Sequence, residues 1–287
     1  MVESIWRKGK LFGFMLLAGI LLMAKPALAD SYYPYEIQGY DVTVKVGKDN
    51  VYHVTERLQV NFNQARHGIY RDIPVINNVS REDGSTSRIQ ARVTNIKTYG
   101  EKKTVGREGS YCRIQLGDKN KTLVGEHMYH ISYDYNMGKD VRKGEDEFYY
   151  NIIGTSWDTT IQNVTFHIMM PEDIDESKVG MAYGESGSTN NEGLQYTING
   201  KVMEGYVDPS IILNPGEAVT VRMVLPDGYY DQVKQRIWPA LISILLSLAA
   251  AGAAFLLWWK VGRDNVVVET IQFHPPKEFN SVEAAFA

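Results

Sequence analysis

Hydrophobic residues form two long runs near the ends of the chain, and the segment between them alternates hydrophobic with polar residues. The first run, residues 11–24, follows three basic residues, Arg7, Lys8 and Lys10. The second run, residues 237–259, is long enough for a helix of roughly 35 Å at about 1.5 Å per residue. A helix needs about 20 apolar residues to cross a bilayer. The pattern therefore predicts one transmembrane helix, at 237–259.

The first run has the order of features found in a secretory signal peptide. Basic residues precede it, and the small-residue sequence Ala27-Leu28-Ala29 follows it. We predict that residues 1–29 are removed by cleavage between Ala29 and Asp30. Because a cleaved signal peptide carries the following segment across the membrane, residues 30–232 are expected outside the cytoplasm and the short tail 260–287 inside it.

Basic and aromatic residues flank the predicted span. Lys234 and Arg236 precede it, and Lys260 and Arg263 follow it, so the counts of basic residues are equal and do not decide the orientation. The signal peptide decides it, which places the protein in the cell membrane with its C-terminus in the cytoplasm. The aromatic residues expected to anchor the span at the lipid interfaces are Trp238, Trp258 and Trp259, with Tyr229 and Tyr230 on the outer side.

The exported segment reads as all-β. Val42, Val44 and Val46 share one face of a strand, residues 47–50 supply turn chemistry, and alternation resumes at 52–62, which predicts a β-hairpin. No helical run is long enough for crossovers, so we expect antiparallel sheets packed as a sandwich. Further strands are expected at 112–116, 129–135, 164–170 and 219–225, and loops at 77–88, 100–110 and 183–193.

Charge and cysteine content narrow the classes of protein. The net charge is -4 and no basic block occurs, so the sequence lacks the electrostatic footprint of nucleic-acid binding. Cys112 is the sole cysteine, so no intrachain disulfide can form and the core must be built from packing. Cys112 shares strand parity with Ile114 and Leu116, which indicates a buried small hydrophobic residue rather than a reactive thiol.

One carboxylate lies at a strand position whose side chain should face the core. Glu56 lies on the same strand face as Val54 and Leu58, where an unpaired charge would be costly. Arg71 shares parity with Ile73 in the next segment and is its predicted partner. We expect a buried structural ion pair between Glu56 and Arg71. The alternatives are a β-bulge that turns Glu56 outward and a catalytic acid.

Four short motifs stand out along the exported segment. They are Val54-Thr55-Glu56, the run from His67 through Pro74, the run from Asp146 through Asn151 leading through Gly154 to Trp157, and the run from Leu225 through Tyr230. In this order they resemble the DUF2207 family of predicted bacterial membrane proteins, a domain of unknown function. The resemblance implies an extracytoplasmic β-rich domain tethered to a membrane, and it implies no activity. Family members are usually longer and have more spans, so the chain is expected to be a short relative or a truncated sequence.

Recognisable catalytic or cofactor chemistry is missing from the sequence. The six histidines are spread singly, so we predict neither a metal site nor a cofactor. The acidic clusters at 145–147 and 173–176 lack the spacing of a known calcium loop and read as solvated turns. Tyr129, Tyr133 and Tyr135 lie on the apolar side of a strand and are expected in the core.

Three function classes remain. We expect a membrane-tethered binding or sensing module without catalytic activity, in contact with the lipid bilayer and with another envelope protein or a cell-wall component. A second class is a scaffold subunit of a membrane complex. The alternative is a cell-envelope glycan hydrolase, in which Asp146, Glu147 and Asp158 near Trp157 would supply the carboxylates. The tail 260–287 is too short to form a domain of its own and is expected to order only against a partner or a longer continuation.

Overall fold

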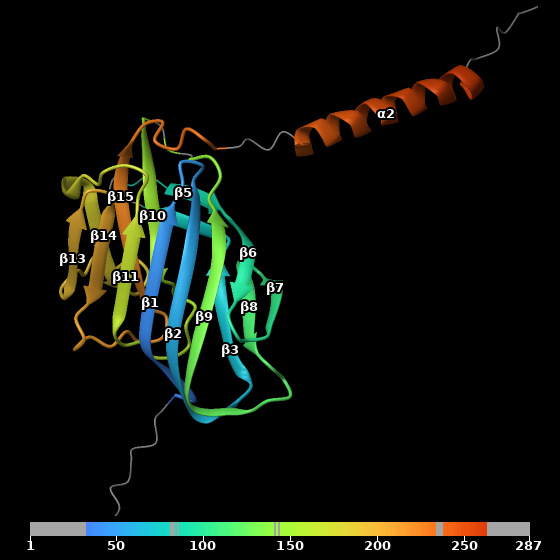
Figure 1. Cartoon of the computed structure of the whole chain (residues 1–287). Helices are drawn as coiled ribbons and strands as arrows, with labels where there is room; N and C mark the ends of the chain where they lie inside the picture. The colour runs from blue at the N-terminus through green and yellow to red at the C-terminus, as the bar shows by residue number, and fades with distance from the viewer. Residues whose placement is uncertain are drawn as a thin grey trace, which may run out of the picture. The chain divides into compact units, whose positions relative to one another are not determined.

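The computed structural model describes residues 33–80, 84, 86–140, 142, 144–233 and 238–262 (Figure 1). The predicted signal peptide with its cleavage site at Ala29 and Asp30, and the tail beyond residue 262, lie outside these residues. The chain divides into two units, residues 1–235 with the β-domain and residues 236–287 with one helix.

The described residues of the first unit form four sheets. A seven-stranded sheet has the order β13-β14-β11-β1-β2-β9-β6, two three-stranded sheets have the orders β10-β15-β12 and β3-β8-β7, and β4 pairs with β5. A short 3-10 helix, η1 (Glu176–Lys178), precedes β12. The strands are β1 (Tyr35–Val46), β2 (Val51–Arg66), β3 (Gly68–Pro74), β4 (Ile76–Ser80), β5 (Thr86–Gln90), β6 (Arg92–Thr98), β7 (Lys103–Glu108), β8 (Tyr111–Gly117), β9 (Leu123–Asn136), β10 (Glu145–Ile153), β11 (Val164–Met169), β12 (Val179–Gly184), β13 (Leu194–Asn199), β14 (Val202–Val207) and β15 (Ala218–Pro226).

The predicted hairpin is confirmed as β1 and β2. Val46 pairs with Tyr52 across the turn, and the register continues to Tyr35 opposite Phe62. Asn50 closes the turn with a positive φ of 56°, a conformation that asparagine tolerates better than most residues. The expected strands at 112–116, 129–135, 164–170 and 219–225 are found in β8, β9, β11 and β15.

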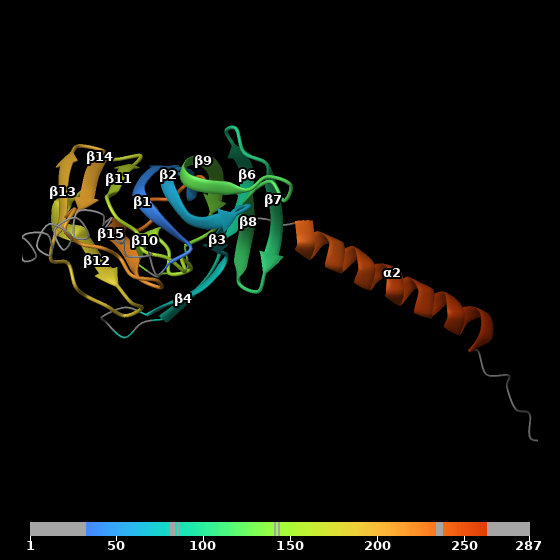
Figure 2. The ribbon, with the colours of Figure 1, turned by 90° about the horizontal axis from the view of Figure 1, so that it is seen from below.

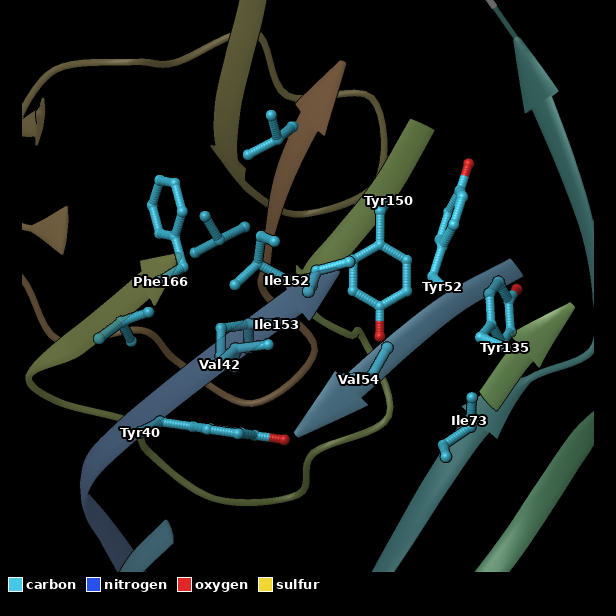
Figure 3. Packing of buried hydrophobic residues seen from close by; sticks show 14 of the residues in the cluster. Tyr40, Val42, Tyr52, Val54, Ile73, Tyr135, Tyr150, Ile152, Ile153 and Phe166 are labelled. Carbon is cyan, nitrogen blue, oxygen red and sulfur yellow. The ribbon is translucent and has the colours of Figure 1, made fainter. Parts of the chain in front are cut away.

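The β-domain is a two-layer sandwich. Seen from below, the seven-stranded sheet forms one layer, and strands β10, β15, β12 and β3 lie in the second layer, which faces it (Figure 2). The core between the layers is rich in aromatic residues. Tyr150 of β10 lies beside Tyr52 and Tyr135, with ring centroids 5.8 and 5.7 Å away (Figure 3). Tyr129, Tyr133 and Tyr135 are all buried, as expected.

One strand pairing and two of the loops differ from the sequence-based expectations. The sheets are antiparallel except between β1 and β11, which run parallel and pair Tyr40 with Val164. This pairing requires the chain to return after more than a hundred residues, which strand alternation does not reveal. Two of the expected loops contain strands: 77–88 includes most of the hairpin of β4 and β5, and 100–110 includes β7.

The second unit contains helix α2 (Trp238–Val261), 24 residues long. Its segment Ala240–Val261 is long and apolar enough to cross a membrane. Trp258 and Trp259 lie in its last turn and are about half exposed. Tyr229 and Tyr230 were expected at the membrane interface, but both are buried in the β-domain, so they are not available as interface anchors.

Candidate functional site

Glu56 and Arg71 meet inside the sandwich. Arg71 Nε lies 2.9 Å from Glu56 Oε2, and Arg71 Nη2 lies 2.8 Å from Glu56 Oε1. The Glu56 side chain is 0% exposed and that of Arg71 is 2% exposed. β2 supplies Glu56 and β3 supplies Arg71, so the pair joins the seven-stranded sheet to the opposite layer. Pairing of Glu56 with Val42 and Ile131 is continuous, so no bulge turns Glu56 outward.

Tyrosine hydroxyls complete the hydrogen bonding of the carboxylate. Tyr40 and Tyr133 donate to Glu56 at 2.8 and 2.6 Å, and the Tyr133 and Tyr150 hydroxyls are 2.9 Å apart. Burial by itself raises the pKa of Glu56, but the charge of Arg71 and these hydrogen bonds outweigh it, so that pKa lies below its ordinary value. Glu56 is therefore held as a carboxylate, which suits a structural ion pair and not a proton donor.

A small cavity adjoins the ion pair. It has a volume of about 20 Å³, room for about one water molecule, and its lining includes Arg71, Tyr150 and Gly154. The Trp157 ring covers Arg71 from another side, with the guanidinium carbon 5.7 Å from its centroid. The cluster around Glu56 and Arg71 can hold layers together but is too enclosed to receive a substrate.

The three carboxylates suggested for a hydrolase, Asp146, Glu147 and Asp158, each accept a hydrogen bond from a different group of the protein. Glu147 accepts a hydrogen bond from Arg222 Nε at 2.6 Å, and Asp146 accepts one from the Tyr230 backbone at 3.0 Å. Asp158 accepts one from the Tyr35 hydroxyl at 2.5 Å. Both Asp146 and Glu147 are buried.

The distance between these carboxylates follows from the strand pairing. Phe148 of β10 packs on Tyr52, which pairs with Val46 at the end of β1. Asp158 instead contacts Tyr35, at the start of β1. The 12 residues of β1 separate these ends by about 35 Å at about 3.3 Å per residue. The paired carboxyl groups of a glycosidase lie about 5–10 Å apart, so Asp158 cannot act together with Asp146 or Glu147.

Metal and thiol chemistry find no support in the described part of the chain. No group of three or more His, Cys, Asp or Glu side chains there is arranged to hold a metal ion. Asp175 of the cluster at 173–176 serves the local turn, since it accepts from the backbone of Ser177. Cys112 is half-buried and packs against the core, and burial raises the pKa of its thiol, which disfavours the reactive thiolate.

The solvent-facing side of the seven-stranded sheet carries an open groove of about 590 Å³. We call it the sheet-face groove. Its volume is within the range of ligand-binding pockets. Strands β1, β2, β9, β11 and β14 contribute to it through Gly39, Tyr40, Asp41, Thr43, Arg57, Gln59, Met128, Asn163, Thr165, His167, Met169, Val202 and Glu204.

Local irregularities accompany one end of the sheet-face groove. The register of β1 against β2 shifts between Ile37 and Gly39, and Gly39 presents no side chain to the solvent face. Asn163, just before β11, has a positive φ of 48°, and its side-chain amide donates to the Gln38 carbonyl at 2.7 Å. A β-bulge and a left-handed asparagine thus meet where the parallel pair β1 and β11 begins.

Charged side chains form a network across the groove. Asp41 accepts from Thr165 Oγ1 at 2.9 Å and lies 3.8 Å from Arg57. His167 lies between Asp41 and Glu204, at 3.7 and 3.4 Å. Two carboxylates, of Asp41 and Glu204, thus share this network with one guanidinium, of Arg57, and one imidazole, of His167. Arg57, Met128 and Glu204 are each about 60% exposed, so ligand atoms can reach them.

Comparison with protein families identifies the domain. Residues 36–225, more than half of the chain, match the family described as "Predicted membrane protein (DUF2207) N-terminal domain". The chain belongs to the DUF2207 family. The resemblance seen in the sequence is thereby confirmed, as is the all-β fold with one helix able to span a membrane.

Other comparisons add no functional information about this DUF2207 protein. No curated protein matches it. An M1 zinc metallopeptidase from Deinococcus radiodurans has a TM-score of 0.36 at 9% identity, with 66% of this chain and 42% of that chain covered. The native leukotriene A4 hydrolase of Saccharomyces cerevisiae has a TM-score of 0.37 at 6% identity, with 70% and 32% covered. This chain thus spans less than half the length of these enzymes, and similarity at this level carries no argument.

Three of the DUF2207 motifs converge on the buried cluster. Val54-Thr55-Glu56 supplies the carboxylate, the run from His67 to Pro74 supplies Arg71, and the run that ends at Trp157 supplies the ring over Arg71. A Cβ atom at Gly154 would lie 3.7 Å from Arg71 Nη1, so only a small residue leaves space there. The motifs that carry the family resemblance therefore build the fold, whereas none of the residues that line the sheet-face groove belongs to them.

No pattern in the sequence pointed to the sheet-face groove. Its polar residues, such as Asp41 and Arg57, read as an ordinary solvated face of alternating strands. One sequence feature indicates part of the groove: Gly39 is a glycine inside a strand pattern, and such a glycine often marks a β-bulge. The remaining lining comes from β11 and β14, whose position beside β1 depends on the parallel pairing.

Proposed function

We propose that this protein is a membrane-anchored binding module of the cell envelope, with its β-domain outside the cytoplasm and its C-terminus inside. The sheet-face groove is the observation that carries this proposal. It gathers exposed side chains from five strands into one concave surface, while the candidate carboxylates of a hydrolase are engaged elsewhere. The ligand would be another envelope protein or a cell-wall component, and the domain would bind it without chemical change.

The orientation is supported by the predicted signal peptide together with helix α2. We expect Lys119→Cys, introduced at an exposed position of a Cys112→Ala chain, to react with a membrane-impermeant maleimide on intact cells. Ser281→Cys in the same background should react only after the membrane is permeabilised. The reverse labelling pattern would contradict the proposed orientation.

Binding through the groove is tested with the full chain in lipid nanodiscs. Immobilised protein is exposed to separated polysaccharide and protein fractions of the cell envelope, and the retained mass is measured. Gly39→Tyr would fill the groove, and Gly39 has no positive φ that would strain another residue. The proposal expects a retained component that the Gly39→Tyr chain releases. Equal retention by both chains would contradict it, and release of soluble fragments from the polysaccharide would favour a hydrolase.

A further inference from the structure

The backbone beneath the sheet-face groove cannot bind a ligand. β1 is paired on both sides, with β2 and β11, and β2 is paired with β1 and β9. Their amide and carbonyl groups are used within the sheet, so an extended peptide cannot add to these strands as a new strand does at a sheet edge. Recognition in the groove must come from side chains.

The groove side chains offer both kinds of hydrogen-bonding group. Asp41 and Glu204 accept, Arg57 donates, and Gln59 does both. A hydroxyl group also donates and accepts, so a ligand with many hydroxyls can satisfy this mixed set. In the network the two carboxylates outnumber the one guanidinium, which disfavours polymers that carry carboxylates, sulfates or phosphates.

Apolar surface lies within and beside the groove. Met128 lines it and is 61% exposed. Tyr206 is 41% exposed on β14 and follows Glu204 by two residues, so it lies on the same sheet face. The Tyr206 hydroxyl donates to Gln195 Oε1 at 2.8 Å, which fixes one end of its side chain. An anchored, exposed ring next to hydrogen-bonding groups can pack against the apolar face of a sugar ring.

The openness of the groove favours a chain over a small molecule. Pockets for small ligands bury about 70–90% of the ligand surface, which a groove on the open face of a sheet does not do. A polymer gains contacts from successive units along the sheet. We infer that the sheet-face groove binds an uncharged glycan chain, with ring hydroxyls on Asp41, Arg57 and Glu204 and a ring face on Tyr206. This inference rests on the proposed function and specifies its ligand.

The test is calorimetric titration of the full chain in nanodiscs with defined oligosaccharides. Alkyl glycoside detergents are avoided because they present sugar rings themselves. The probes are two neutral hexasaccharides, chitohexaose and cellohexaose, an acidic oligogalacturonate, and an oligolysine peptide. We expect saturable binding of at least one neutral hexasaccharide and none of the oligogalacturonate.

Two groove variants and one control make the result specific. Tyr206→Ala and Gly39→Tyr are each expected to weaken binding of the neutral glycan at least tenfold with unchanged thermal unfolding. The exposed Tyr206 can be removed without opening the core. Glu126→Gln is the control, because Glu126 is an exposed carboxylate on the same sheet face outside the groove. It should bind as the unaltered chain does.

Failure of the inference is distinguishable from failure of the proposed function. The inference is overturned if neither neutral hexasaccharide binds at millimolar concentration, if both groove variants bind unchanged, or if oligolysine binds more tightly than the glycans. The last result would assign the groove to a cationic peptide. If the defined glycans fail while Gly39→Tyr still releases an envelope component, the ligand class is wrong and the groove remains a binding site.

Discussion

The guanidinium of Arg71 on β3 forms a two-pronged ion pair with the carboxylate of Glu56 on β2, at 2.8 and 2.9 Å, in the buried interior of the sandwich. The pair connects two sheets that share no backbone hydrogen bond in the strand order. Tyr40 and Tyr133 use the remaining acceptor capacity of the carboxylate. Such a pair adds little net stability over apolar packing, but breaking it strands a buried charge.

Removal of one partner of this pair is therefore expected to be costly. Arg71→Met keeps an unbranched apolar stem but removes the guanidinium and leaves Glu56 unpaired, and the free energy of unfolding should fall by about 3–5 kcal/mol. The change is measured by thermal and denaturant unfolding of the full chain in detergent micelles. Circular dichroism in the β-sheet band follows the β-domain.

Arg113→Met is the matched control for Arg71→Met. Arg113 also forms a two-pronged pair, with Asp72, but its side chain is 37% exposed and solvent can rehydrate Asp72. Its loss should shift the unfolding temperature much less. Equal shifts for the two arginine variants would show that the interior position of the Glu56 pair has no energetic consequence.

The cost of Arg71→Met should depend on pH. In the unaltered chain the pKa of folded Glu56 is lowered, so its contribution to stability is present above the unfolded pKa, about 4.3, and is lost as the pH falls through the folded pKa. Without Arg71, burial should instead raise the pKa of Glu56, so the variant gains stability as Glu56 becomes protonated. The difference in unfolding free energy should thus be largest near neutral pH and shrink toward pH 4.

A double variant separates Glu56 from the other titrating groups. Glu56→Gln combined with Arg71→Met has no charge left in the cluster. Its stability difference from Arg71→Met alone should vary with pH in step with Glu56 ionisation. A difference that stays constant between neutral and acidic pH would contradict the assignment to Glu56.

The tyrosine hydroxyls allow a matched comparison on one strand. Tyr133 of β9 donates to Glu56 at 2.6 Å, so Tyr133→Phe should cost about 1–3 kcal/mol. Tyr129, also on β9, has a buried hydroxyl that finds no partner among the described residues, so Tyr129→Phe should be neutral or stabilising. Unfolding of the two variants under the same conditions checks the order, and a larger cost at Tyr129 would be evidence against the proposed role of Tyr133.

Features that depend on local pattern were predictable from the sequence. The hairpin of β1 and β2 follows from alternation on either side of a Gly-Lys-Asp-Asn turn. The contact of Glu56 with Arg71 was anticipated because a core-facing carboxylate in a strand needs a partner and one core-facing arginine follows it. These inferences need only the period of a strand and the cost of a buried charge.

Features that depend on distant pairing were not predictable. β1 lies beside β11 in parallel, which places Asp41 next to His167 and creates the sheet-face groove. Asp158 was grouped with Asp146 and Glu147 because they are near in sequence, yet they lie toward opposite ends of β1. Strand alternation tells which face a residue occupies but not which strand becomes its neighbour.

One such distant contact gives a sharp prediction at Gly205. On β14, Gly205 pairs with Phe166 of β11, and a Cβ atom there would lie 2.2 Å from the Phe166 ring and 2.9 Å from the Gln195 carbonyl oxygen. Gly205→Ala must displace either a buried ring or the backbone of β13, so it should cost about 1–3 kcal/mol or more.

The comparison for Gly205→Ala is a second glycine inside a strand. A Cβ atom added at Gly180 of β12 would meet no atom of the described residues within 4 Å, and neither glycine has a positive φ. Gly180→Ala restricts the unfolded chain without a clash, so it should be neutral or raise the stability by up to about 1 kcal/mol. Thermal unfolding of both variants in the full chain is the measurement. Similar unfolding temperatures would mean that β14 does not lie against Phe166 and Gln195 in this register, and the Glu204 edge of the sheet-face groove would have to be placed anew.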